Sequence, residues 1–124
     1  MSVKLVTDEE ATPEVRGMFE KIKEQFGEVP PTLRAMANYP EYLGILLQKM
    51  NLVLGAGTLD IKSKMLIAMT VSTLNNCETC IDMYSNKLKQ MGVTDQEFVE
   101  LMAVIDLVGG MNNFNNGMRI YPQK

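Results

Sequence analysis

Helix start and stop signals recur along this 124-residue chain, whereas patterns typical of β-strands are nearly absent. Thr12 precedes Pro13, which is a polar N-cap followed by proline at the first helical position. Asp60 also precedes an apolar segment, and Thr94 and Glu97 have the spacing of a capping box. The chain therefore predicts an all-α fold of about six to seven helices.

The breaks between apolar segments place the expected helices. Glycines, prolines and the pair Asn75-Asn76 separate segments whose apolar residues recur at helical spacing. They predict helices at 13–26, 40–54, 61–74 and 77–91, a short helix after Pro31, and one from the capping box through residue 108. Gly109-Gly110 is expected to break this last helix, and the asparagine-rich segment 111–120 has only weak helix propensity. No linker or repeat is found, so residues 1–124 are expected to form one domain.

Charge and composition exclude several classes of function. The chain carries 12 basic and 15 acidic residues and has no basic stripe, which argues against nucleic-acid binding. It has no apolar stretch of about 18 residues and no signal-peptide core at its start, so we expect no membrane segment and a cytoplasmic location. The chain contains no histidine, which rules out imidazole catalysis and histidine-ligated metal sites. We expect neither a metal nor a cofactor.

Two predicted helices are apolar on more than one face. Between Phe98 and Val108 only Glu100 and Asp106 are charged, and Lys49 is the only charge in residues 42–54. A helix that is apolar all round must be covered on all sides, and 124 residues provide few covering layers. This excess of apolar helix surface over what the chain can cover predicts subunit interfaces. The alternative is that one of these segments is the central helix of a monomer.

Reactive chemistry is concentrated at Cys77-Glu78-Thr79-Cys80. Two cysteines at i and i+3 share one face of a helix, with Cα atoms about 5–6 Å apart, which a disulfide can bridge. A helix N-terminus favours a thiolate, whereas carboxylates at Glu78 and Asp82 disfavour it. The pattern is compatible with a redox-active dithiol and also with two cysteines that pack in the core.

Three neighbouring segments resemble a known family: Gly55-Ala56-Gly57-Thr58-Leu59-Asp60, the segment 63–84 that contains both cysteines, and Met91-Gly92-Val93-Thr94-Asp95-Gln96-Glu97. The family is that of carboxymuconolactone decarboxylase and the alkylhydroperoxidase D-like (AhpD-like) proteins. The resemblance covers most of residues 40–118, which we take as the core of the domain. It implies an all-α, mostly antiparallel domain that assembles as a homo-oligomer, a trimer or a hexamer.

The resemblance also implies roles for individual residues. In the peroxidase branch the second cysteine attacks the peroxide and the first closes the disulfide, which makes Cys80 the attacking thiol and Cys77 its partner. The relay glutamate and histidine of the family are replaced here by Met65 and Tyr84, and Thr79 stands between the cysteines. A neutral phenol cannot take the proton of a thiol near neutral pH, although it can donate a hydrogen bond. Tyr84 could equally be a packed side chain.

Together these features favour a thiol–disulfide oxidoreductase with peroxidase-like chemistry. It would need no cofactor, would act on a peroxide or disulfide substrate, and would be reduced by an external thiol. We expect it to be weak as a peroxidase, because both relay residues are absent. Two alternatives stay open. One is a non-catalytic oligomeric or small-ligand-binding member with structural cysteines. The other is an enzyme that acts on a cyclic or lactone-like substrate without the dithiol.

Overall fold

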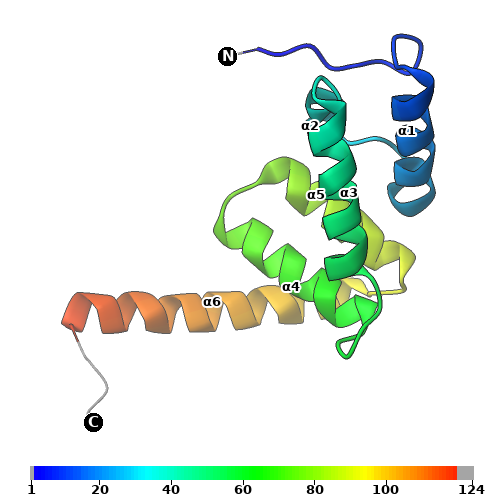
Figure 1. The fold of residues 1–124 in the computed structure, drawn as a ribbon. Helices are drawn as coiled ribbons and strands as arrows, with labels where there is room; N and C mark the ends of the chain where they lie inside the picture. The colour runs from blue at the N-terminus through cyan, green and yellow to red at the C-terminus, as the bar shows by residue number, and fades with distance from the viewer. Residues whose placement is uncertain (1, 120–124) are drawn as a thin grey trace.

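The computed structural model describes residues 2–119, and within this range the chain forms six α-helices and no β-strand. The helices are α1 (Pro13–Phe26), α2 (Pro31–Met36), α3 (Pro40–Leu54), α4 (Ile61–Leu74), α5 (Glu78–Gln90) and α6 (Asp95–Met118). Figure 1 shows α1 to α3 at one end, α4 and α5 in the middle, and α6 extending away from the body. The predicted all-α fold is confirmed.

The helix starts are set by the side chains that the sequence indicated. Thr12 Oγ1 accepts a hydrogen bond from the Val15 amide at 3.3 Å, and Asp60 Oδ1 accepts one from the Ser63 amide at 2.7 Å. Both hydrogen bonds of the capping box at Thr94 and Glu97 are present. Because these caps satisfy otherwise unpaired amides of the first turn, purely local chemistry fixes where α1, α4 and α6 begin.

The C-terminal helix differs from the prediction. The expected break at Gly109-Gly110 is wrong, because α6 is one continuous helix of 24 residues. Glycine lowers helix stability by about 1 kcal/mol relative to alanine, but it keeps its amide hydrogen and makes no steric clash, so it does not force a break as proline does. The helix ends at Arg119, which adopts a left-handed conformation with φ 53°. The last residue of the predicted segment, residue 120, lies outside the described range.

Two hydrophobic clusters form the interior. The N-terminal cluster comes from the chain before α1, from α1, α2 and α3, and from the connections between them; its buried residues are Ala11, Val15, Phe19, Ile22, Val29, Leu33, Ala37 and Leu43. The C-terminal cluster lies among α4, α5 and the start of α6, and its buried residues are Met65, Met69, Leu88 and Val93. Among the helices, α4 and α5 make the most extensive contact.

Polar contacts tie the first residues of the chain onto the N-terminal cluster. Asp8 accepts hydrogen bonds from Lys23 Nζ at 2.6 Å and from Arg34 Nη1 at 3.0 Å. The Arg34 guanidinium also lies 5.0 Å from the centroid of the Phe19 ring, within range of a cation–π contact. These contacts hold residues 6–8 against α1 and α2.

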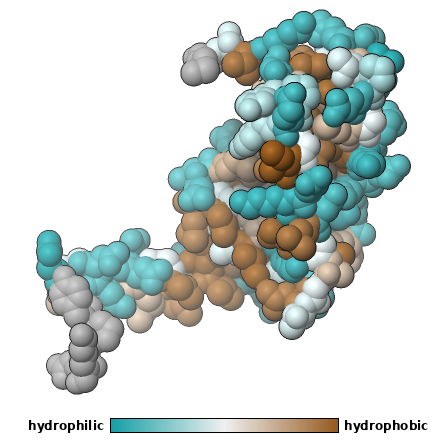
Figure 2. Space-filling model, in the orientation of Figure 1, coloured by the Kyte–Doolittle hydropathy of each residue, from teal (hydrophilic) through white to brown (hydrophobic). Residues whose placement is uncertain are grey.

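The C-terminal half leaves much of its apolar surface uncovered. Figure 2 shows hydrophobic surface gathered over the lower half of the molecule, where α4 and the first half of α6 lie, while the region of α1 is mostly hydrophilic. None of the residues of α6 is buried. Seven apolar residues on this helix are at least half exposed, namely Val99 and six others that lie further along it. We call these six the α6 stripe: Val104, Leu107, Val108, Met111, Phe114 and Met118. No helix in the described part of the chain is long and apolar enough to cross a membrane.

Candidate functional site: the disulfide at the start of α5

A tight turn between α4 and α5 places the first cysteine. Asn76 adopts a left-handed conformation with φ 55°, and the Cys77 amide donates a hydrogen bond to the Ser72 carbonyl at 3.0 Å. Asparagine tolerates this conformation better than most residues, which explains its use at the turn. The helix predicted at 77–91 begins one residue later, at Glu78, because Cys77 itself is the N-cap.

The two cysteines are joined in a disulfide. Their Cα atoms lie 5.3 Å apart, within the distance expected from their i and i+3 positions. Both residues are partly exposed, so the bond lies at the surface rather than in a sealed core. The Cys77 carbonyl accepts a hydrogen bond from the Ile81 amide at 2.9 Å, which continues the helix past the CxxC segment.

Met65 and Tyr84, which the sequence resemblance places at the two relay positions, lie in the same cluster on the inner side of α5. Met65 is 3% exposed and belongs to the C-terminal cluster, and Tyr84 is half-buried against that cluster. Burial raises the pKa of the Tyr84 phenol above its usual value of 10.0. The phenol therefore stays protonated near neutral pH and cannot act as a base towards a cysteine thiol.

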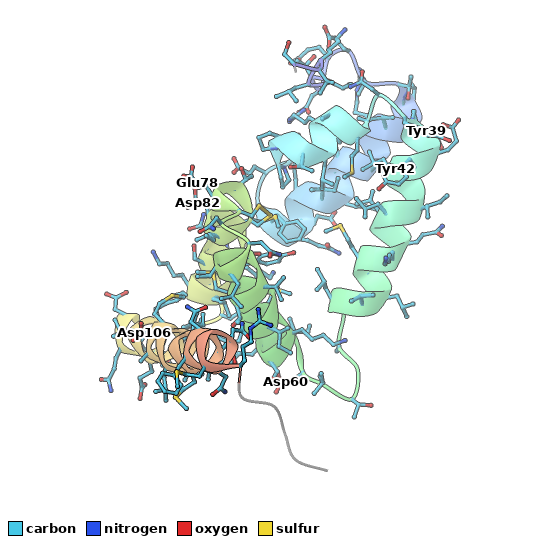
Figure 3. All side chains as sticks on the ribbon, turned by 90° about the vertical axis from the view of Figure 1, so that its left-hand side faces the viewer. Tyr39, Tyr42, Asp60, Glu78, Asp82 and Asp106 are labelled. Atoms are coloured by element: carbon cyan, nitrogen blue, oxygen red, sulfur yellow. A yellow bond between two sulfur atoms is a disulfide. The ribbon has the colours of Figure 1, made fainter. Side chains whose placement is uncertain are left out.

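Thr79 is separated from these two residues. It is exposed, and it lines a cavity of about 240 Å³ on the outer side of α5 together with Glu78 and Asp82. Figure 3 shows the side chains of Glu78 and Asp82 close together on this helix. The structure thus brings together only two of the three residues expected around the cysteines, and it gives Thr79 a solvent-facing position.

No sequence pattern indicated the residues that face α5 from the N-terminal half. The end of α1, the connection to α2 and the start of α2 line the outer cavity with Phe26, Glu28, Pro30 and Pro31. Lys87 Nζ donates a hydrogen bond to the Gln25 carbonyl at 3.1 Å, which links the end of α1 to α5. Because these partners are about 60 residues apart in the chain, no local pattern indicates the contact. Within residues 2–119 no group of three or more Cys, Asp or Glu side chains is arranged to hold a metal ion.

Comparison with known proteins assigns the chain that forms this site to a family. The model of the carboxymuconolactone decarboxylase family matches residues 40–121, which is well over half of the chain. The chain belongs to the carboxymuconolactone decarboxylase family. The matched region contains α3 to α6, and therefore the CxxC disulfide and the residues packed beneath it.

Individual members of the family agree with this assignment. The crystal structure of the alkylhydroperoxidase AhpD core from Rhodospirillum rubrum superposes with a TM-score of 0.89 and is 29% identical, covering 99% of this chain and 94% of that chain. An uncharacterized protein of Methanocaldococcus jannaschii is 29% identical over 83 residues, which are 66% of this chain and 80% of the relative. The match to the AhpD core extends over the N-terminal cluster as well, so the arrangement of both halves is shared with a solved structure.

Proposed function

We propose that this protein is a thiol–disulfide oxidoreductase with peroxidase-like, antioxidant chemistry, in which Cys77 and Cys80 alternate between a dithiol and a disulfide. The observation that carries the proposal is the partly exposed Cys77–Cys80 disulfide at the start of α5, in a chain with the AhpD-like fold. A helix start supplies unpaired backbone amides that favour a thiolate. We place this cycle in the cytoplasm, where small and protein thiols are available as reductants.

The cycle balances without a cofactor. The Cys80 thiolate attacks the O–O bond of a hydroperoxide, becomes a sulfenic acid and releases an alcohol after protonation. The Cys77 thiol then attacks the Cys80 sulfur, the disulfide forms and water leaves. Two equivalents of an external thiol restore the dithiol and are themselves oxidised to a disulfide. A disulfide substrate enters by exchange with the same dithiol.

The peroxide branch of this cycle should be slow, because neither of the two relay positions supplies a base. Met65 has no ionisable group, and burial keeps the Tyr84 phenol protonated. General acid–base catalysis typically contributes about 10²–10⁴ in rate. We therefore expect exchange with disulfides to be the faster reaction of the two.

Thiol counting on the reduced protein tests the proposal. Reduced wild type treated with one equivalent of hydrogen peroxide should lose both free thiols and regain them with a reductant. In Cys77→Ser the sulfenic acid on Cys80 should persist and be trapped by dimedone, whereas Cys80→Ser should react much more slowly. Wild-type thiols that stay free under both peroxide and a disulfide would refute the proposal and favour the non-catalytic, ligand-binding alternative.

A gain-of-function variant tests the role of the missing relay. Met65→Glu combined with Tyr84→His introduces the residue types that the relay uses. We expect the rate of peroxide consumption to rise at least about ten-fold. Tyr84→Phe is the matched control and should leave the rate unchanged, because the phenol acts only by packing. A ten-fold loss in Tyr84→Phe would show instead that the hydroxyl takes part in the reaction.

We also propose that the protein acts as a homo-oligomer, with a second copy of the chain covering the α6 stripe. The stripe residues recur at the i, i+3, i+4 and i+7 spacing of helix–helix seams, and the sequence carries no charge between residues 107 and 118. Self-pairing of this segment therefore brings no like charges together. The resemblance to the family favours a trimer or a hexamer.

Light scattering tests this assembly. Leu107→Glu with Met111→Glu places charges on the stripe and should lower the solution mass, whereas Asn113→Glu on the opposite face of α6 should not change it. A wild-type protein that is monomeric at 100 µM, or a mass that the stripe variant leaves unchanged, would refute the proposed interface.

A further inference from the structure

A second cavity lies on the inner side of Lys87, between the C-terminal ends of α1 and α3 and the first turns of α4. Its volume is about 180 Å³. Apolar side chains from these helices form most of its lining: Phe26, Met50, Leu54, Ile61 and Met65. An apolar cavity of about 150 Å³ is large enough to bind benzene. The space therefore accommodates one small ring or a short aliphatic chain.

Met65 gives this cavity an apolar floor. The side chain is 3% exposed and packs in the C-terminal cluster, so the inner end of the cavity has no charge. Its thioether is flexible and polarisable, which allows it to adapt to an aromatic or an aliphatic group. The inner end of the cavity thus suits the apolar part of a ligand.

The polar side of the cavity contains one cation and neutral amide groups, whose carbonyl oxygens already accept hydrogen bonds within the chain. Lys87 Nζ donates to the Gln25 carbonyl at 3.1 Å, and Gln25 Nε2 donates to Asn51 Oδ1 at 3.0 Å. An ammonium group has three donors, and Lys87 forms no ion pair among the described residues. The amide nitrogen of Asn51 is a further donor. These groups suit an anionic head group.

The distribution of carboxylates between the two cavities also favours an anionic ligand in the inner one. Glu28, Glu78 and Asp82 line the outer cavity, and no acidic residue lines the inner one. Lys87 and Phe26 line both cavities and therefore stand between them. An anion is disfavoured on the acidic side, whereas on the inner side it meets one cation, neutral polar groups and no carboxylate.

We propose that the inner cavity binds a small amphiphilic anion, namely one ring or short chain with a single carboxylate. The apolar part would contact Met65, Leu54 and Ile61, and the carboxylate would accept hydrogen bonds from Lys87 and Asn51. The lining includes Met65 from the relay position but neither cysteine.

Binding of benzoate, compared with its neutral analogue benzamide, tests the proposal on the full chain. Methyl NMR should show saturable shifts at Ile61 and Met65 with benzoate, and benzamide should bind about five-fold more weakly, as expected for the loss of one partly exposed ion pair. Lys87→Gln should remove the preference for benzoate. Lys89→Gln, a neighbour on α5 that lines neither cavity, should retain it.

Two further variants separate this site from the proposed redox function. Ile61→Trp places a large side chain at the exposed edge of the cavity and should abolish binding. The double variant Cys77→Ser, Cys80→Ser should bind benzoate as wild type does, even though it cannot cycle. The proposal is overturned if benzoate causes no saturable shift at the cavity methyls, if benzamide binds as tightly, or if Lys87→Gln keeps the preference.

Discussion

The two hydrophobic clusters of this protein differ in how completely the chain covers them. The N-terminal cluster includes Phe19 and Leu43 with no exposed area, and Asp8, Lys23 and Arg34 close over it. The C-terminal cluster has fewer buried residues, and α6 beside it has none. The disulfide belongs to this less covered half. The half of the molecule that carries the disulfide is thus the less covered of the two.

A core truncation should give the largest effect. Phe19→Ala removes a side chain with no exposed area and should cost about 3–5 kcal/mol of unfolding free energy. Leu107→Ala on the α6 stripe is the comparison, and it should change the stability of the single chain by less than about 0.5 kcal/mol. Urea unfolding at low protein concentration measures both values. An equal loss of unfolding free energy in both variants would show that the two halves are covered to the same extent.

Reduction of the disulfide should destabilise the C-terminal half of the molecule and leave the N-terminal half unchanged. Closing a loop as short as residues 77–80 stabilises the chain by about 2 kcal/mol in the loop-entropy model. We expect a reductant to speed amide hydrogen exchange in α4 and α5 and to leave α1 to α3 unchanged. Cys77→Ser should show no response to the reductant. Faster exchange throughout the chain would instead indicate that both clusters unfold as one unit.

The carboxylates beside the disulfide should slow its reaction with anionic substrates. Glu78→Gln with Asp82→Asn should speed reduction by glutathione about two- to ten-fold at low ionic strength, since exposed charges interact by about 0.2–1 kcal/mol each. The gain should shrink as salt is added. Asp106→Asn is the control, because Figure 3 places Asp106 on α6, away from Glu78 and Asp82. An equal gain from Asp106→Asn would mean that only the net charge matters.

The smallest expected effect is on the stability of the folded protein at acidic pH. The hydrogen bond from Lys23, and then that from Arg34, hold the pKa of Asp8 below its usual value of 3.8. A carboxylate with a lowered folded pKa stabilises the protein above its unfolded pKa, and this stabilisation is lost as the pH falls through the folded value. Asp8→Asn should therefore be less stable than wild type near neutral pH, and the difference should shrink as the pH falls below 3.8 and through the lower pKa of the folded state.

Thermal unfolding from about pH 7 to about pH 2 measures the Asp8 difference. Glu24→Gln is the matched control, because Glu24 forms no ion pair among the described residues. A difference for Asp8→Asn that persists at low pH would show that the substitution acts through packing or hydrogen bonding rather than through the charge.

Local chemistry explains what could be predicted of the fold. The caps at Thr12, Asp60 and Thr94 act through atoms at most three residues away, and all three form as expected. Gly109-Gly110 shows the limit of the same reasoning, since helix propensity is a weak preference and the continuous α6 overrides it.

At the site, the sequence determined the spacing of Cys77 and Cys80, because a helix turn alone brings their Cα atoms within bridging distance. The tertiary structure decided what surrounds them. The side chains of Met65 and Tyr84 lie in one cluster on the inner side of α5, Thr79 faces solvent, and residues 25–31 approach α5 from a distant part of the chain. The reason is physical: caps and i, i+3 pairs form within one segment, whereas cavities arise only where segments far apart in the chain pack against each other.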